Sequence, residues 1–351
     1  MKRLIAILSF VAIANIAMMP VVTAEENAEV LNVNTPADEA TEVIGIFSSS
    51  EFKRNISKEF SVSSTPTLNV SNRFGKINIV EGAGDKIIFN ITITGKGNSE
   101  SEAKKYSETV DVNIVQKGNS INANTSLKSI NCKNCGRTTD YEIIVPKNTK
   151  YILDNRHGDV SINNTTESAE IKVEFGKLYA NELSDADITI RHGESTINKS
   201  NNLKFESSFS THKLGVVGSV NGKFRHGGFD AKEMGSANVD AEFSTISIDR
   251  LKNSFVSKNI RHGSLEIDKV DNDFSNIAID ANFTKVQVDL SGNNNFKTTL
   301  YTSFGSIDTG NLKFLEKSLD KKDAVVGVVG NVKDPFATVS ISNRHGNIEL
   351  N

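Results

Sequence analysis

The sequence contains no tryptophan, and after its first two dozen residues it contains no long run of apolar residues. The missing run excludes a membrane-spanning helix there, because a span needs about 20 apolar residues in succession. Several patterns of catalytic and ion-binding sites are also absent: G-x-S-x-G, H-E-x-x-H, the phosphate-binding loop and the calcium-binding loop. The 24 glycines and the scarcity of long apolar runs favour many short strands and tight bends over helices.

Cysteine is nearly absent too, since Cys132 and Cys135 are the whole complement. In an exported chain such a C-x-x-C pair predicts a local disulfide. A zinc site would need two more ligands, and there is no second cysteine pair to supply them. A redox role normally places C-x-x-C at the start of a helix, whereas Asn, Lys and Gly around this pair favour a turn. We therefore predict a disulfide within a loop.

Residues 1–24 have the pattern of an export signal. Lys2 and Arg3 precede an apolar stretch from Leu4 to Met19, and small residues end the segment at Ala24. The apolar stretch is shorter than a bilayer span requires, and no cysteine marks a lipid anchor. We expect an exported chain in the periplasm, on the outer-membrane surface or outside the cell, with no integral membrane segment. The net charge of -3 gives little support to a nucleic-acid partner.

A short pattern recurs along the chain: an aromatic ring, a small residue, and hydrophobic residues three and five positions after the ring. We number each repeat from its ring, which is position 0. The rings are Phe74, His157, Phe175, His192, Phe209, His226, Phe243, His262, Phe283, Phe304 and His345. From His157 to Phe304 they follow one another at intervals of 17 to 21 residues, which indicates a repeat array.

Each repeat predicts two short strands joined at a bend. Positions -4 and -2 are mostly apolar, as are +3 and +5, and this period of two is typical of strands. The extra residue at the bend lets both strands face inward, so we expect each ring to point inward as well. Such a unit cannot pair its own backbone and must stack on similar units about 4.8 Å away. We predict an all-β fold, a right-handed parallel β-helix (β-solenoid) with coils of about 17–21 residues.

The alternation of Phe and His repeats allows a second arrangement, in which one coil holds two repeats and spans 34–40 residues. Phe would then stack on Phe and His on His. Position -1 favours one repeat per coil, because arginine there alternates with Glu, Ser or Asn. Two repeats per coil would place arginine directly on arginine, which is destabilising.

The expected organisation is a flexible lead-in at 25–56, with order beginning near Phe60, and a β-solenoid domain at 57–351. Excursions from the repeat occur at about 80–150 and 311–335. A short helix is expected at Ser99–Val110, because the segment has helix formers and an acidic start. The first excursion either covers one end of the array or leaves strand edges that pair with another copy.

Lys58–Val62, followed by Asn72–Ile79, the pair Glu102-Ala103 and the later aromatic-Gly bends resemble the putative-adhesin domain of exported bacterial proteins. This is a β-helical domain of unknown function, and the resemblance extends from about residue 57 to the end. It implies the fold and attachment to the cell surface or envelope, and it supplies no catalytic residues. The chain departs from the family in its repeated Arg-His-Gly, where such repeats more often have Tyr-Gly or Phe-Gly.

Five of the six histidines lie in Arg-His-Gly. We expect each ring to be half buried in the slot that Phe fills elsewhere, hydrogen-bonded to a backbone carbonyl. The alternative is a metal-binding or pH-sensing row. With one repeat per coil, however, the histidines are about 9–10 Å apart, twice the strand spacing, and too distant to share an ion. We predict no metal and no cofactor. His212 lies outside the series and is expected on the surface.

The arginines at position -1 are expected to form a stripe on the outer face: Arg156, Arg191, Arg225, Arg261 and Arg344, with Arg73 before them. The stripe is either a solvated row balanced by Glu174 and Glu242 or a binding surface for acidic glycans or lipid headgroups.

The predicted function is that of an exported, non-enzymatic, adhesin-like surface or envelope protein that binds an extended ligand, a glycan or an envelope protein. One alternative is a periplasmic scaffold or sensor domain that partners an envelope regulatory protein. Another is a polysaccharide-active β-helix enzyme, which would need clustered carboxylates. Asp271 and Asp273 are close in sequence, but they are expected to lie in a turn between coils.

Overall fold

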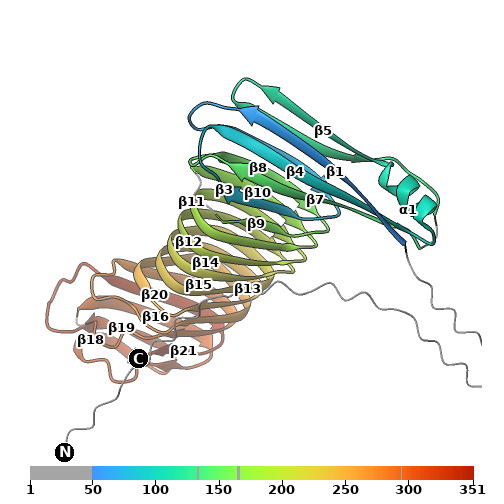
Figure 1. Cartoon of the computed structure of the whole chain (residues 1–351). Coiled ribbons are helices and arrows are strands. Elements are labelled where there is room, and N and C mark those ends of the chain that lie inside the picture. The colour runs from blue at the N-terminus through green and yellow to red at the C-terminus, as the bar shows by residue number, and fades with distance from the viewer. Residues whose placement is uncertain (1–49, 133, 164–166, 294) are drawn as a thin grey trace, which may run out of the picture. The chain divides into compact units, whose positions relative to one another are not determined.

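The computed structural model describes residues 50–132, 134–163, 167–293 and 295–351, which belong to the unit Phe47–Asn351 (Figure 1). The expected export signal at 1–24 and residues 25–49 of the expected lead-in lie outside the described residues. Within the described ranges, no helix combines the length and the apolar character that crossing a membrane requires.

Strands dominate the described residues, and the prediction of an all-β fold is confirmed. The elements are β1 Ser50–Ser61, β2 Thr67–Arg73, β3 Ile77–Glu81, β4 Lys86–Gly97, α1 Glu100–Ser107, β5 Val110–Lys117, β6 Ser120–Leu127, β7 Gly136–Val145, β8 Lys150–Arg156, β9 Val160–Ile162, β10 Ser168–Glu174, β11 Lys177–Arg191, β12 Glu194–Ser208, β13 Thr211–Ile248, β14 Leu251–Ile267, β15 Asn276–Val288, β16 Phe296–Phe304, β17 Ile307–Asp308, β18 Phe314–Lys321, β19 Ala324–Val329, β20 Thr338–His345 and β21 Ile348–Leu350. Their pairing makes one mixed sheet.

Consecutive repeats are direct neighbours in this sheet. β10 pairs in parallel with β11, and Ile171 lies beside Ile188, its counterpart one repeat later. The parallel pairing continues from β11 through β12, β13 and β14 to β15 (Figure 1). The alternative with two repeats per coil is therefore wrong, because it would place every second repeat side by side instead of consecutive repeats.

The alternation of apolar and polar residues places the core between the strands of each layer. In β10 the side chains of Ala169, Ile171 and Val173 are buried, while the residues between them remain partly or fully exposed. The pattern recurs in each layer and builds one continuous core of Ile, Val, Leu, Ala and Phe. Burial of these side chains supplies the main stabilising term, at roughly 25 cal/mol per Å² of apolar surface.

The first excursion covers the N-terminal end of the array. β6 pairs in parallel with β2, and β7 pairs in parallel with β3. Beyond them, β5 pairs antiparallel with β6, and β4 pairs antiparallel with β7. β1 then pairs antiparallel with β4. The expectation that order begins near Phe60 is wrong, because β1 begins at Ser50 and pairs with β4 along the full length of that strand.

At the other end, the order of the layers differs from the order of the sequence. β20, which belongs to the last repeat, lies between β15 and β16: Val339 is beside Ile277 on one side and Thr298 on the other. The second excursion forms the antiparallel pair β18–β19, which extends the sheet beyond β16. The layers therefore do not follow the sequence order to the end of the array, since β20 from the last repeat lies within it.

Candidate functional site

The position-0 rings from all the repeats stack face to face in one column. Adjacent ring centroids are 4.2 to 5.0 Å apart, and adjacent ring planes differ by at most 13°. The order along the column is Phe74, His157, Phe175, His192, Phe209, His226, Phe243, His262, Phe283, His345 and Phe304. We call this set the ring column.

Phe and His alternate without exception along the ring column, although they do not in the sequence. Phe283 and Phe304 are consecutive in the repeat series, and His345 follows them. The insertion of β20 between β15 and β16 places His345 between the two Phe rings, 4.2 Å from one and 4.6 Å from the other. The position of β20 thus completes the alternation.

The rings point out of the core, so the prediction that they point inward is wrong. Their backbone is left-handed at nine of the eleven positions, for example at Phe175, with φ of 55°, and at Phe209, with φ of 53°. This conformation turns positions -1 and 0 outward together. The Phe175 and Phe209 side chains are consequently 52% and 54% exposed.

A left-handed conformation costs an L-residue about 1–2 kcal/mol, and the column repeats that cost at successive layers. Two features offset it. The backbone N–H at position 0 still pairs across layers, as from Phe175 to the Arg191 carbonyl at 3.0 Å. Both faces of each inner ring are also covered by neighbouring rings, which contributes stacking and burial.

Because the ring faces are covered, the ring edges form the accessible surface. The edge of an aromatic ring carries partial positive charge, and imidazole edges add nitrogen atoms. In the described part of the chain, no ring nitrogen of the column makes a hydrogen bond, so the expected bonds to backbone carbonyls are absent. Successive imidazoles are separated by a Phe ring and lie about 10 Å apart, twice the strand spacing. One metal ion cannot bridge that distance.

The arginines at position -1 lie in a row along the ring column, which we call the arginine row. Arg156 and Arg191 flank Glu174, with N–O distances of 3.3 and 3.5 Å. Arg225, Arg261 and Arg344 are exposed and form no ion pair with any described residue. Of the two glutamates expected to balance the row, Glu174 does so and Glu242 does not.

A cavity of about 500 Å³ lies on the arginine row, and its lining residues extend from the Arg261 layer past Arg344 to the layer of Ser303. The side chains that line it are mainly polar: Lys258, Asn259, Arg261, Asp280, Asn282, Tyr301, Thr302, Ser303, Asp323, Ser342, Asn343 and Arg344. The repeats here are longer, and the pairing of β14 with β15 shifts register between Ser257 and Ile260. The longer interval between rings was the sequence signal for this irregularity.

His212 is buried, with 1% exposure, and the prediction of a surface position is wrong. Its Nδ1 lies 2.8 Å from the Ser195 hydroxyl and its Nε2 2.6 Å from the Ser207 hydroxyl. Burial lowers the pKa of His212 to about 3. The missed signal is its place at +3 from Phe209, a position that points into the core in the neighbouring repeats.

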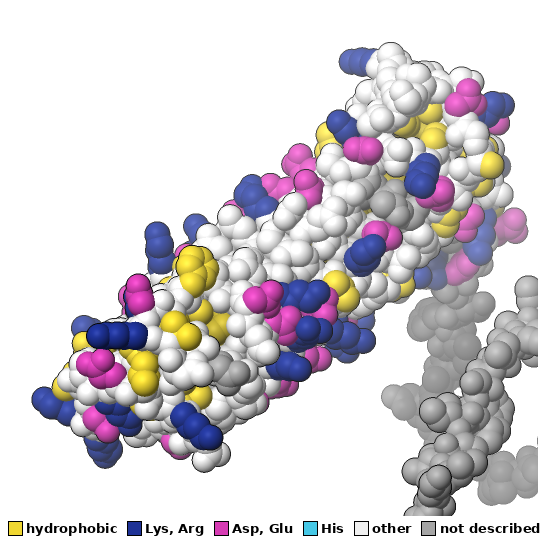
Figure 2. Space-filling view, turned by 90° about the vertical axis from the view of Figure 1, so that its left-hand side faces the viewer, with side chains coloured by type: hydrophobic (Ala, Val, Ile, Leu, Met, Phe, Trp, Pro, Cys, Tyr) yellow, Lys and Arg dark blue, Asp and Glu magenta, His cyan; other side chains and the backbone are white. Residues whose placement is uncertain are grey.

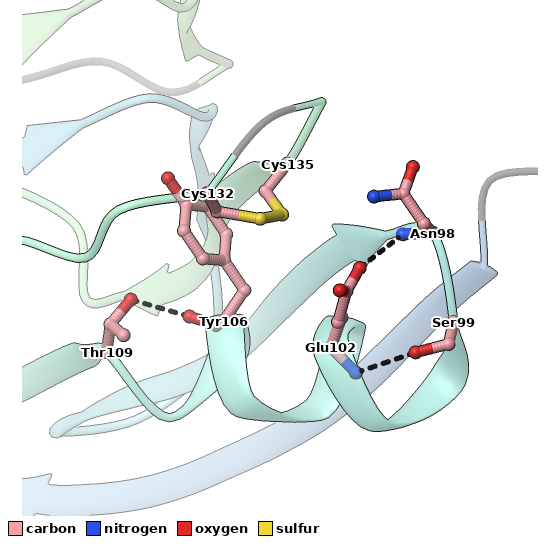
Figure 3. Close-up of a disulfide and its surroundings, with 7 residues drawn as sticks. All are labelled: Asn98, Ser99, Glu102, Tyr106, Thr109, Cys132 and Cys135. Carbon is pink, nitrogen blue, oxygen red and sulfur yellow. Dashed lines mark hydrogen bonds between the residues drawn. A yellow bond between two sulfur atoms is a disulfide. The ribbon is translucent and has the colours of Figure 1, made fainter.

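A disulfide joins Cys132 and Cys135 beside α1 (Figure 3). The side chain of Ser99 caps this helix by accepting from the Glu102 N–H at 3.2 Å, and a Glu102 carboxylate oxygen accepts from the Asn98 N–H at 3.0 Å. Glu102 and the two sulfurs have ligand atoms within 4.8 Å of one another. Metals bind cysteine as thiolate, and these sulfurs are bonded to each other, so the group is not a metal site.

Replacing both cysteines with serine is expected to lower the free energy of unfolding by about 2 kcal/mol, because the disulfide closes a very short loop. Urea unfolding of the purified mature chain measures this change. The single variant Asn131→Ser, at an exposed position beside the disulfide, is the control and should match the wild type. Loss of folding in the double variant would contradict a local role for the disulfide.

No protein-family profile matches this chain, and no curated protein matches it. Several solved structures are similar to it. A putative adhesin from Bacteroides fragilis NCTC 9343 has 14% identity and a TM-score of 0.40, over 64% of this chain and 97% of that chain. A putative adhesin from Parabacteroides distasonis ATCC 8503 has 11% identity and a TM-score of 0.35, over 64% and 96%. A putative lipid binding protein from the same strain has 11% identity and a TM-score of 0.35, over 66% and 95%. At these scores the likeness carries no argument about the site.

Proposed function

We propose that the chain is an exported, non-enzymatic β-solenoid that binds an extended ligand along the arginine row and the ring column. The proposed fold is a right-handed parallel β-helix with coils of about 17–21 residues, in a domain at 57–351 that β1 extends back to Ser50. Parallel pairing between consecutive repeats supports it, and parallel crossover connections are right-handed in about 98% of cases. The proposed location is the periplasm, the outer-membrane surface or the medium.

The observation that carries the binding proposal is the ring column with arginines along its margin. A stacked array presents similar side chains at each layer, which suits a ligand that is itself a repeating polymer. Arg225, Arg261 and Arg344 are exposed without acidic partners among the described residues. Guanidinium groups of this kind donate charge-assisted hydrogen bonds to carboxylates, sulfates or phosphates. A glycan or an envelope protein with such groups is the proposed partner.

The carboxylates weighed as catalytic groups do not favour a polysaccharide-cleaving enzyme. Asp271 accepts two hydrogen bonds from the Arg250 guanidinium, at 2.7 and 2.9 Å. Hydrogen bonding to Arg250 lowers the pKa of Asp271. A glycosidase needs a general acid whose pKa is raised, paired with a second carboxylate across the scissile bond. The proposal is therefore for binding without turnover.

Changing Arg225, Arg261 and Arg344 together to alanine is expected to weaken binding to acidic glycans about 100-fold, because three charge-assisted contacts are lost. A glycan array followed by calorimetry on the strongest ligand measures the effect. The matched control changes Lys147, Lys232 and Lys269 to alanine, which removes the same charge from exposed positions outside the row. Equal binding by the triple arginine variant and the wild type would contradict the proposal, and so would turnover of the ligand.

A further inference from the structure

Charge along the arginine row alternates with the kind of ring in each layer. In the five His layers, position -1 is arginine: Arg156, Arg191, Arg225, Arg261 and Arg344. In the Phe layers that alternate with them, position -1 is never basic after the first layer, where Arg73 precedes Phe74: the residues are Glu174, Ser208, Glu242, Asn282 and Ser303. The ring column therefore carries an Arg-His pair in every second layer.

The parallel row at position -3 reinforces this alternation in the middle of the column. Lys223 shares the His226 layer with Arg225, and the next layer holds Asp240 with Glu242. Glu206 in the Phe209 layer lies beside Lys223 in the strand pairing. Asp280 continues the acidic set in the Phe283 layer. On the face in Figure 2, by contrast, charged side chains of both signs are intermingled and no histidine is visible.

Opposite charges on neighbouring strands stabilise a sheet, and this could account for the alternation without any ligand. It does account for Glu174, which pairs with both Arg156 and Arg191. It does not account for the other three arginines, which form no ion pair with a described residue although acidic groups occupy the intervening layers. Their guanidinium groups are left for a partner outside the chain.

The alternation also fixes the spacing that such a partner must have. Ring centroids in adjacent layers are 4.9 Å apart at His262 and both of its neighbours, so successive Arg-His layers are separated by about 10 Å. DNA places a phosphate about every 3.4 Å along each strand. Most of its charges would then face Phe layers, where Glu242 and Asp280 would repel them.

We propose that the ligand is a linear polysaccharide in which an acidic sugar alternates with a non-acidic one. This rests on the proposed function and names the ligand of the same surface. An extended disaccharide advances by nearly two strand spacings, so acidic groups would meet Arg-His layers in succession. The non-acidic sugars would face the Phe layers, where Ser208, Asn282 and Ser303 offer hydrogen-bonding partners for hydroxyl groups.

The cavity between Arg261 and Arg344 is the part of this surface best formed to hold sugar residues. Its volume of about 500 Å³ lies within the range of small-ligand sites. The two arginines lie one Phe layer apart, with Asn282 between them at position -1 and Asp280 beside it at position -3. An acidic group can therefore bind at either arginine, whereas a third acidic group between them would meet Asp280.

The experiment compares polymers of equal length with the purified mature chain by calorimetry. Hyaluronan decasaccharide has one carboxylate for every two sugars, decagalacturonate has one on each sugar, and chitin oligosaccharide has none. We expect hyaluronan to bind at least tenfold more tightly than decagalacturonate. Glu242→Gln combined with Asp280→Asn should raise decagalacturonate affinity at least tenfold and leave hyaluronan affinity within twofold. Arg261→Ala combined with Arg344→Ala should weaken hyaluronan binding at least tenfold.

The outcomes separate this inference from the proposed function. If decagalacturonate binds as tightly as hyaluronan and the arginine variant weakens both, the surface binds polyanions and the alternation is overturned. If no polymer binds, or if chitin binds as well as hyaluronan, the proposed use of the arginine row fails too. Binding to vesicles of phosphatidylglycerol without binding to either acidic polymer overturns the inference in favour of a lipid surface.

Discussion

The Gly176→Val variant is expected to lose at least about 3 kcal/mol of unfolding free energy, because overpacking against fixed backbone is costly. A Cβ atom on Gly176 would lie 2.0 Å from the carbonyl oxygen of Gly158 in the neighbouring layer. That oxygen belongs to backbone held by strand pairing, so no flexible side chain can move aside. Urea unfolding followed by circular dichroism measures the loss.

Two variants make this result specific to the close approach of the layers. Ser210 occupies the same position in its repeat, and its hydroxyl donates to the Ser208 carbonyl at 2.8 Å. Gly176→Ser can copy that bond and should lose less than Gly176→Val. Gly136→Ala is the control, because a Cβ there meets nothing closer than 3.8 Å, and it should change stability by less than about 0.5 kcal/mol. A valine variant as stable as this control would contradict the stacking.

Acidification is expected to destabilise the protein through His212. Burial lowers the pKa of His212 to about 3, whereas the same imidazole in the unfolded chain titrates near 6.5. Below pH 6.5 the unfolded chain therefore binds a proton that the folded chain does not. Stability is fully present above that pH and is lost as the pH falls towards 3, by about 3 kcal/mol at pH 4.

The test compares urea unfolding at pH 7, 5.5 and 4. In His212→Asn the amide can still bond the hydroxyls of Ser195 and Ser207, but it does not titrate. Between pH 7 and pH 4 the free energy of unfolding of this variant should therefore fall by about 3 kcal/mol less than that of the wild type. Thr211→Asn changes the exposed neighbour of His212, has no titratable side chain in either form, and should keep the slope of the wild type. Equal slopes in His212→Asn and the wild type would show that the buried imidazole is not the titrating group.

Periodicity was enough to predict strands and the pairing of consecutive repeats. Positions such as Ile171 and Val173 are buried because the side-chain period of a strand is two, and arginine at alternate -1 positions favours one repeat per coil over two. Periodicity failed where the backbone leaves the extended region. A left-handed residue turns its side chain to the other face, so rings counted as core, such as Phe175, point outward. His212 shows the converse, because its polarity concealed a place that faces the core.

Much of the candidate site could be predicted from the sequence, because its rings all lie at position 0 of the repeat and its arginines at position -1. The arginine row follows directly from position -1. The place of His345 between Phe283 and Phe304 did not follow, because pairing between distant strands is not encoded by a local pattern. The cavity depends on that same insertion, since Arg344 reaches it only from β20. That Arg225 forms no ion pair with a described residue depends on side-chain conformation, which the spacing of residues in the sequence does not determine.

Six histidine signals offer the most direct test of the claim that ligands bind along the ring column. The protein labelled with ¹³C at its imidazole rings would be titrated with hyaluronan decasaccharide and followed by NMR. The signals of the five column histidines should shift with the ligand, most strongly at His262 and His345: His157, His192, His226, His262 and His345. The His212 signal should stay in place. Saturable binding with the five column signals unchanged would show that the ligand binds elsewhere on the protein.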